Sequence, residues 1–286
     1  MSEALLSPIV PSLLVGALAG THAATWGMYK DSAYEGFSVR KYFRSVLLGM
    51  AVAVALPSLR PVDPTTPHGF VVLFGLTYVL ERLLVEWTKV FLRREDQSKY
   101  FIPMQFAIGG RVVRNPWYRL AAGLLYAGGI VLVVRLVEGL APLTRSSWMV
   151  AVALGGLGGL VCALGGAWKD APLEGFSFFK FLRSPGIAAA WAGLLALLTR
   201  DPVALSFGAL GYSIATIETY KKFYRPLEPP GKFDGKPVRF PQMLAWRRRF
   251  VPLYLAVSGT VVTVFAAALR DAASGRPTLA SILAGQ

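Results

Sequence analysis

A charged motif occurs twice in this chain of 286 residues. Segments 30–45 and 169–184 align without a gap, and nine of their 16 positions are identical, in the pattern K-D-x-x-x-E-G-F-S-x-x-K-x-x-R-S. At average amino-acid usage, unrelated segments of this length share roughly one position. The match therefore predicts an internal duplication, and any chemistry of the motif is expected twice.

The cations of the motif favour binding of an anion. Each Ser-x-x-Lys-x-x-Arg run predicts a helix capped by Ser38 or Ser177, because a serine oxygen accepts from the first free N–H groups. Helix N-termini near Ser45 and Ser184 would add partial positive charge. Such a setting favours a phosphate-bearing ligand. The predicted anion-binding residues of the motif are Lys30, Lys41, Arg44, Lys169, Lys180 and Arg183.

The carboxylates of the motif allow a different chemistry. The two acids of each copy are four residues apart, so they share a helix face if the helix extends that far, and the following glycine predicts a break. Oxygen ligands of this kind suit Mg²⁺. The candidate metal ligands are Asp31, Glu35, Asp170 and Glu174. In a purely structural alternative, the charges of each copy pair with one another and fix the corner.

Glu86 and Glu218 match in a second repeated stretch, at an offset of 132 residues. Each has a lysine three residues later, close enough for an ion pair on a helix. Both glutamates are candidates for the substrate site, where they would orient the cations or carry a coupling proton. Pairing with Lys30 or Lys169 across helices is the structural alternative. Glu81 lies about a turn deeper, and an ionisable group inside a membrane is a functional candidate by default.

The composition indicates a polytopic membrane protein. Hydrophobic residues make up 54% of the chain and charged residues only 16%, which excludes a disordered chain and an ordinary soluble enzyme. One cysteine excludes a disulfide framework, and two histidines leave little for a histidine-rich metal centre. The apolar segments number eight, at about 5–28, 45–59, 69–91, 118–140, 147–167, 186–199, 203–223 and 250–269.

The basic residues predict the orientation. The loops at 29–45, 82–119, 169–184 and 221–249 hold 24 of the 30 Lys and Arg residues. The positive-inside rule places these loops in the cytoplasm, so both termini are expected outside the cell (inner) membrane. The net charge of +14 then follows from topology and attraction to anionic lipids, so no nucleic-acid partner is expected.

The repeat predicts two four-helix halves, 1–145 and 146–286, in one membrane domain. An even helix number inserts both halves the same way round, related by a pseudo-twofold axis along the membrane normal. The small-residue faces Gly16-x-x-x-Gly20 and Gly155-x-x-x-Gly159 allow close helix packing. The first helices of the two halves either cross near the axis, or each packs inside its own half.

The segments at 45–59 and 186–199 are too short to span a membrane comfortably. Either the interfacial helix before each completes the span, or these are broken helices. Short segments at matching places in two halves point to the binding site of a transporter.

This layout resembles the UbiA-type intramembrane prenyltransferases, in which each four-helix half carries an Asp-rich motif. The resemblance implies that Mg²⁺ bridges the four motif carboxylates to a prenyl diphosphate, with Arg44 and Arg183 as diphosphate contacts. The chain departs from that family in lacking the N-D-x-x-D-x-x-x-D run, and a glycine follows the second acid of each motif.

Three functions fit the sequence. The first is a transporter or lipid-handling permease for an anionic, phosphate-bearing small molecule or lipid, which needs no cofactor. The second is a Mg²⁺-dependent transferase acting on a prenyl or lipid phosphate or diphosphate, with isoprenoid phosphate lipids among its expected partners. The third is a non-catalytic scaffold subunit whose basic loops bind a cytoplasmic protein. No nucleotide-binding glycine loop, hydrolase elbow or zinc-protease motif is present in the sequence, which favours a non-enzymatic function.

Overall fold

The computed structural model describes residues 3–94, 100, 104–109, 111–224, 233 and 235–274. Within these ranges the side chains of residues 3–7, 169, 170, 172–174 and 224 are not described. The first half contains α1 (Glu3–Glu35), α2 (Val39–Leu59), α3 (Pro67–Trp87) with the π-helix η1 (Thr88–Leu92), and α4 (Pro116–Glu138), and the hairpin β1 (Ala107–Ile108) and β2 (Arg111–Val112).

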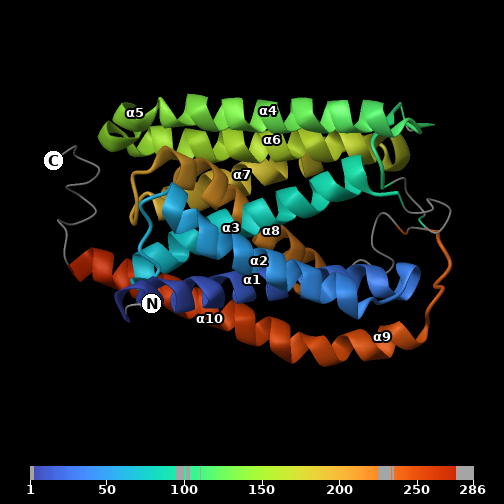
Figure 1. Cartoon of the computed structure of the whole chain (residues 1–286), viewed down its shortest axis with the longest axis horizontal. Helices are drawn as coiled ribbons and strands as arrows, with labels where there is room; N and C mark the ends of the chain where they lie inside the picture. The colour runs from blue at the N-terminus through green and yellow to red at the C-terminus, as the bar shows by residue number, and fades with distance from the viewer. Residues whose placement is uncertain are drawn as a thin grey trace.

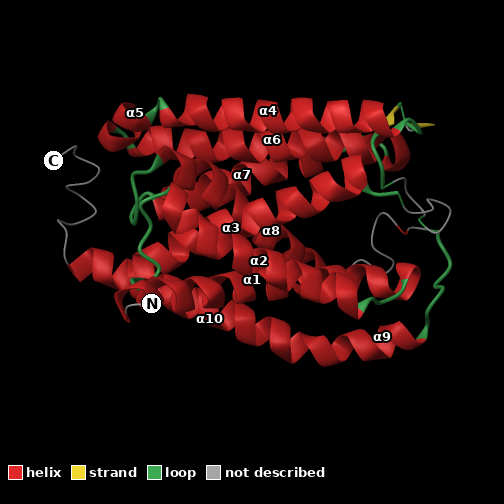
Figure 2. Ribbon diagram, viewed as in Figure 1, coloured by secondary structure: helices red, strands yellow, loops and turns green. Residues whose placement is uncertain are grey.

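The second half is also helical. Its elements are α5 (Ala141–Ser146), α6 (Trp148–Glu174), α7 (Phe178–Leu195), the π-helix η3 (Ala204–Gly208), α8 (Ala209–Thr219), the π-helix η4 (Tyr220–Tyr224), α9 (Gln242–Trp246), the 3₁₀-helix η6 (Arg247–Phe250) and α10 (Val251–Ser274). Figure 1 shows the long helices side by side along the longest axis, and Figure 2 shows that helix dominates the fold.

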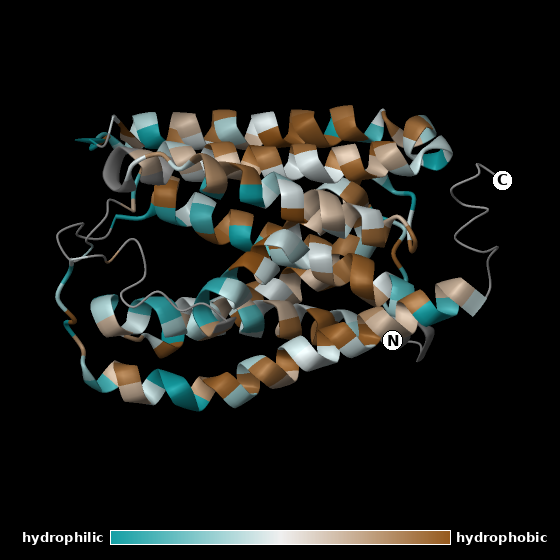
Figure 3. Ribbon diagram, turned by 180° about the vertical axis from the view of Figure 1, so that it is seen from behind, coloured by the Kyte–Doolittle hydropathy of each residue, from teal (hydrophilic) through white to brown (hydrophobic). Residues whose placement is uncertain are grey.

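Within the described ranges, six helical segments are long and apolar enough to cross a membrane, which confirms the all-α membrane class. They are Pro8–Glu35, Val39–Leu59, Pro67–Leu92, Pro116–Glu138, Trp148–Trp168 and Gln242–Ser274. Hydrophobic residues fill the middle of the bundle, and polar residues gather toward its ends (Figure 3). The two other expected segments, 186–199 and 203–223, overlap α7 and the run η3–α8–η4.

The first pair of helices in each half packs through small residues. A Cβ atom at Gly16 would overlap the backbone of Gly49 on α2, and one at Gly20 would overlap that of Ser45. On α6, a Cβ at Gly159 would lie 2.6 Å from Cα of Pro185 on α7. The alternative in which each glycine face packs inside its own half is therefore confirmed, and the first helices do not cross through these glycines.

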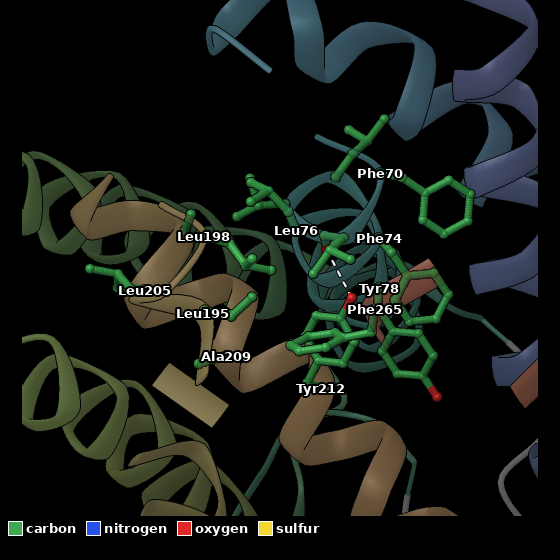
Figure 4. Close-up of a cluster of buried hydrophobic side chains, with 14 of the residues drawn as sticks. Phe70, Phe74, Leu76, Tyr78, Leu195, Leu198, Leu205, Ala209, Tyr212 and Phe265 are labelled. Carbon is green, nitrogen blue, oxygen red and sulfur yellow. Dashed lines mark hydrogen bonds between the residues drawn. The ribbon is translucent and has the colours of Figure 1, made fainter. Parts of the chain in front are cut away.

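The two halves meet where α3 crosses η3 and α8. A Cβ at Gly75 would lie 2.7 Å from the carbonyl oxygen of Gly208, and one at Gly211 would overlap Gly75. The Tyr212 hydroxyl donates to the carbonyl oxygen of Val71 at 2.9 Å. Side chains of α3, α7, α8 and α10 close around this crossing in one continuous hydrophobic core (Figure 4).

An ion-pair group joins the halves at the opposite end from the basic loops. Arg60, after α2, donates to Glu138 of α4 and lies 3.6 Å from Asp201, which precedes η3. Glu138 also accepts from Arg135 at 3.0 Å, as expected for residues three apart on a helix. The first residues of α1 and the last residues of α10 lie at this same end of the bundle, on the left of Figure 1.

We expect Gly16→Val to lower the free energy of unfolding by about 1–3 kcal/mol, because the added side chain forces α1 away from α2. Thermal unfolding of the detergent-solubilised protein measures the change. Gly27→Ala is the matched control on the same helix, since no atom lies within 4 Å of its added Cβ. Equal melting temperatures for Gly16→Val and Gly27→Ala would contradict the close packing.

Candidate functional site

The two copies of the motif form the same helix–break–helix corner. The first helix of each copy ends at a glycine with positive φ, +82° at Gly36 and +79° at Gly175. Ser38 then caps α2 by accepting from the Lys41 backbone N–H at 3.3 Å, and Ser177 caps α7 by accepting from that of Lys180 at 3.4 Å. The predicted break and serine caps are confirmed in both copies.

The prediction of helix N-termini at Ser45 and Ser184 is wrong. Both residues lie inside continuous helices, α2 and α7, which begin at Val39 and Phe178. The interfacial helix and the apolar segment after it are thus one helix, as the first alternative required. Free N–H groups are available one to two turns earlier, because the serine cap sets where the helix starts.

A π-turn follows the matching glutamates in both halves. η1 spans Thr88–Leu92 and η4 spans Tyr220–Tyr224, at the same offset of 132 residues that relates Glu86 to Glu218. A π-turn widens the helix and re-aims the side chains around it, and such turns are frequent at functional sites. In both halves it lies where charged side chains gather.

The first charged group, here named the Arg44 cluster, combines α2 with the end of α3. Arg44 interacts electrostatically with Arg82, Glu81, Glu86 and Arg93. Glu81 accepts from Arg82 Nε at 2.8 Å, and Glu86 accepts from Lys89 Nζ at 2.7 Å. The members of the Arg44 cluster are Arg44, Glu81, Arg82, Glu86, Lys89 and Arg93.

Tyr100 connects Lys41 to this cluster. Its hydroxyl accepts from Arg93 at 2.6 Å and from Lys41 Nζ at 3.5 Å, and both cations also lie over its ring. The structure thus places Lys41, Arg44 and Glu86 of the predicted site together.

The second charged group, here named the Glu218 cluster, crosses between the halves. Glu218 lies 3.6 Å from both Lys221 and Lys222, and Lys30 at the end of α1 interacts electrostatically with it. Arg183 of α7 interacts electrostatically with Lys221, and Asp31 interacts electrostatically with Lys222. The members of the Glu218 cluster are Lys30, Asp31, Arg183, Glu218, Lys221 and Lys222.

Most of the remaining predicted site residues belong to the second copy of the motif. Lys180 is exposed on the first turn of α7. The side chains of Lys169, Asp170 and Glu174 lie outside the described residues. The described residues contain no group of three or more His, Cys, Asp or Glu side chains arranged to hold a metal ion. Since two of the four candidate ligands are not described, the Mg²⁺ site stays a prediction.

A buried polar network joins α1, α3, α8 and α10. His22 Nδ1 lies 2.9 Å from the Tyr78 hydroxyl, which also accepts from Trp26 Nε1 at 2.9 Å. The His22 ring lies against that of Tyr254, whose hydroxyl is 2.7 Å from Thr219. His22 is thus a buried, hydrogen-bonded residue within α1.

The network extends toward the Arg44 cluster through Arg82, whose guanidinium lies over the Trp26 ring. The spacing of four residues between His22 and Trp26, and between Tyr78 and Arg82, could have indicated two facing polar stripes. Only the packing of α1 against α3 shows that they face each other.

Described residues of the connection between α8 and α10 cover the first corner. Phe233 stacks on Tyr34 with ring centroids 4.1 Å apart, and the backbone N–H groups of Arg239 and Phe240 donate to the carbonyl oxygen of Ala33. Arg247 donates to the carbonyl oxygen of Tyr29. At the second corner, exposed aromatic rings remain at Phe176, Phe178 and Phe179.

No family model matches this chain, and no similar curated protein or solved structure was found.

We expect Tyr78→Phe to destabilise the protein by about 1–3 kcal/mol, because it leaves the Trp26 N–H and His22 Nδ1 without their buried partner. Denaturation in detergent measures the loss. Tyr118→Phe removes an exposed hydroxyl and serves as the control. A Tyr78→Phe protein as stable as wild type would show that the network contributes nothing to folding.

Proposed function

We propose that this protein is a transporter or lipid-handling permease of the inner membrane. Its ligand is an anionic, phosphate-bearing small molecule or lipid, bound at a cytoplasm-facing site that both copies of the motif build. The binding residues are the cations of the Arg44 and Glu218 clusters, with Glu86 and Glu218 orienting them.

The observation that carries the proposal is the excess of cations. Among the described side chains, each cluster contains four cations and two carboxylates. Lys222 is only 6% exposed and Arg82 only 13%, so water screens this excess weakly. Like charges held together in a poorly solvated place favour an anion that neutralises them. A phosphate group carries about the missing charge of one cluster.

The proposed fold has eight membrane-spanning helices in two parallel four-helix repeats, related by a pseudo-twofold axis. The matching corners, glycine contacts and π-turns support this duplication. So does a further sequence match, in which Gly110–Pro116 and Gly235–Pro241 share four of seven residues. α3 and α8 have equivalent places in the two repeats, and their contact is where the axis would pass.

The positive-inside rule supports the orientation. The connections α1–α2, α3–α4, α6–α7 and α8–α10 carry most of the basic residues and share one end of the bundle (Figure 1). This end faces the cytoplasm in the proposal, and both termini face outward.

Reconstituted vesicles test the proposal. The first probe is fluorescent NBD-labelled phosphatidylglycerol, and quenching by dithionite measures how fast it flips between the leaflets. The second probe is radiolabelled inorganic phosphate, and the radioactivity inside the vesicles measures its uptake. The two probes distinguish a lipid headgroup from a free anion. We expect one of them to cross in wild-type vesicles, and the double variant Arg44→Ala with Arg183→Ala to lower the rate roughly tenfold or more, because each charged contact contributes about 1.5–3 kcal/mol.

Arg114→Ala with Arg248→Ala is the matched control, since both arginines are exposed and lie outside the clusters. It should transport like wild type. Transport by the Arg44/Arg183 variant at the wild-type rate would refute the proposal. Mg²⁺-dependent product from farnesyl diphosphate, lost in Asp31→Asn, would instead establish the transferase. Inactivity in both assays, with capture of a cytoplasmic protein through the basic loops, would establish the scaffold subunit.

A further inference from the structure

Glu81 is the most deeply buried carboxylate in the described part of the chain. Its side chain is 0% exposed, and one oxygen, Oε2, accepts from Arg82 Nε at 2.8 Å. The other oxygen, Oε1, is buried and has no hydrogen-bond partner among the described residues. The Thr77 hydroxyl, one turn earlier on α3, is buried and unpartnered in the same way. Arg82 therefore provides the hydrogen bond that the structure shows to the Glu81 carboxylate.

The charges around Glu81 come from every element packed against α3. Arg82 and Glu86 lie on α3 itself, and Arg44 of α2 interacts electrostatically with all three. Tyr78 interacts electrostatically with Glu81 and with Tyr254 of α10, and Glu218 of α8 interacts electrostatically with His22 of α1. Among the described residues, Arg82 and Arg44 are cations that interact with Glu81, and both belong to the set that the proposed anion would bind.

We propose that Glu81 takes up one proton each time an anion binds to the Arg44 cluster, so that anion and proton move together. This inference rests on the proposed function and names its coupling residue. A phosphate oxygen competes with Glu81 for the guanidinium groups of Arg82 and Arg44. Once Arg82 turns to the ligand, an ionised Glu81 is left buried without a counter-ion, which is costly in a low-dielectric place. A proton from the cytoplasmic water then adds to the carboxylate, and it leaves again when the anion is released.

The second half cannot couple in this way. At the offset of 132 residues, Ser213 and Ile214 stand where the first half has Glu81 and Arg82. The Ser213 hydroxyl donates to the carbonyl oxygen of Ser184 at 3.3 Å, so it is already paired. Glu218 interacts electrostatically with Lys30, Lys221 and Lys222. If one of these lysines turns to a ligand, two cations still neutralise Glu218. Each transport cycle therefore carries a single coupled proton.

The test is the number of protons bound together with an anion. Two probes keep a constant charge between about pH 5 and 8: dihexanoyl phosphatidylglycerol for a lipid headgroup and sulfate for a free anion. Calorimetric titration of the detergent-solubilised full chain in buffers of different ionisation enthalpy gives the proton count. We expect about one proton per anion for the probe that binds. The affinity should then fall up to roughly tenfold for each pH unit of increase, because binding consumes a proton.

Glu81→Gln keeps the size of the side chain and removes its titration. We expect this variant to bind the probe without proton uptake and with an affinity independent of pH. Asp271→Asn, which removes an exposed carboxylate on α10, should keep the wild-type proton count.

The outcomes separate this inference from the proposed function. Anion binding to the wild type without proton uptake overturns the coupling alone, whatever the variants do. Proton uptake that persists in Glu81→Gln also overturns it, because another group would then bind the proton. Failure of both probes to bind to the wild type overturns the proposed function, and the coupling with it.

Discussion

The close crossing of α3 with η3 and α8 is the contact on which the rest of the structure depends. At Gly75 and Gly211 the two backbones come so near that no side chain fits between them, because an added Cβ would overlap the backbone of Gly208 or Gly75. In a membrane, lipid is as apolar as the helix surface, so association requires close packing of this kind. The crossing fixes the position of both helices along the bundle, and therefore where their charged ends lie relative to α1, α2 and α7.

The position of the charged groups follows from that crossing. α3 and α8 both pass into a π-turn just after Glu86 and Glu218, and each end gathers cations from a neighbouring helix, Arg44 in one case and Lys30 in the other. Among the described side chains, each group contains four cations and two carboxylates. Permanent self-repulsion destabilises a fold unless something compensates for it. An anion, or the headgroup of an anionic lipid, compensates directly, which links the architecture to the proposed transport.

The two halves are alike in their corners and different in what surrounds them. The segment around Phe233, Phe240 and Arg247 covers the first corner, while the aromatic rings of the second remain exposed. Among the described side chains, the buried carboxylate–arginine pair Glu81–Arg82 belongs to the first half, and Ser213 and Ile214 stand at the matching positions of the second. In the proposed function, duplication would give two equivalent binding elements, of which one couples and the other only binds. These two proposed roles would require no difference in the helix packing that the halves share.

The sequence alone determined the helical membrane class, the corners and their caps. These follow from local rules: the share of apolar residues, the positive φ that only glycine adopts easily at Gly36 and Gly175, and the serine that caps each following helix. It also pointed to Lys41, Arg44, Lys30 and Glu218 as charged partners. Only the tertiary structure decided that the glycine faces pack within each half, that Lys30 reaches Glu218 of the other half, and that His22 bonds Tyr78. Each of these depends on how far a helix is rotated and shifted against a neighbour that is distant in sequence, and periodicity within one helix contains no information about that.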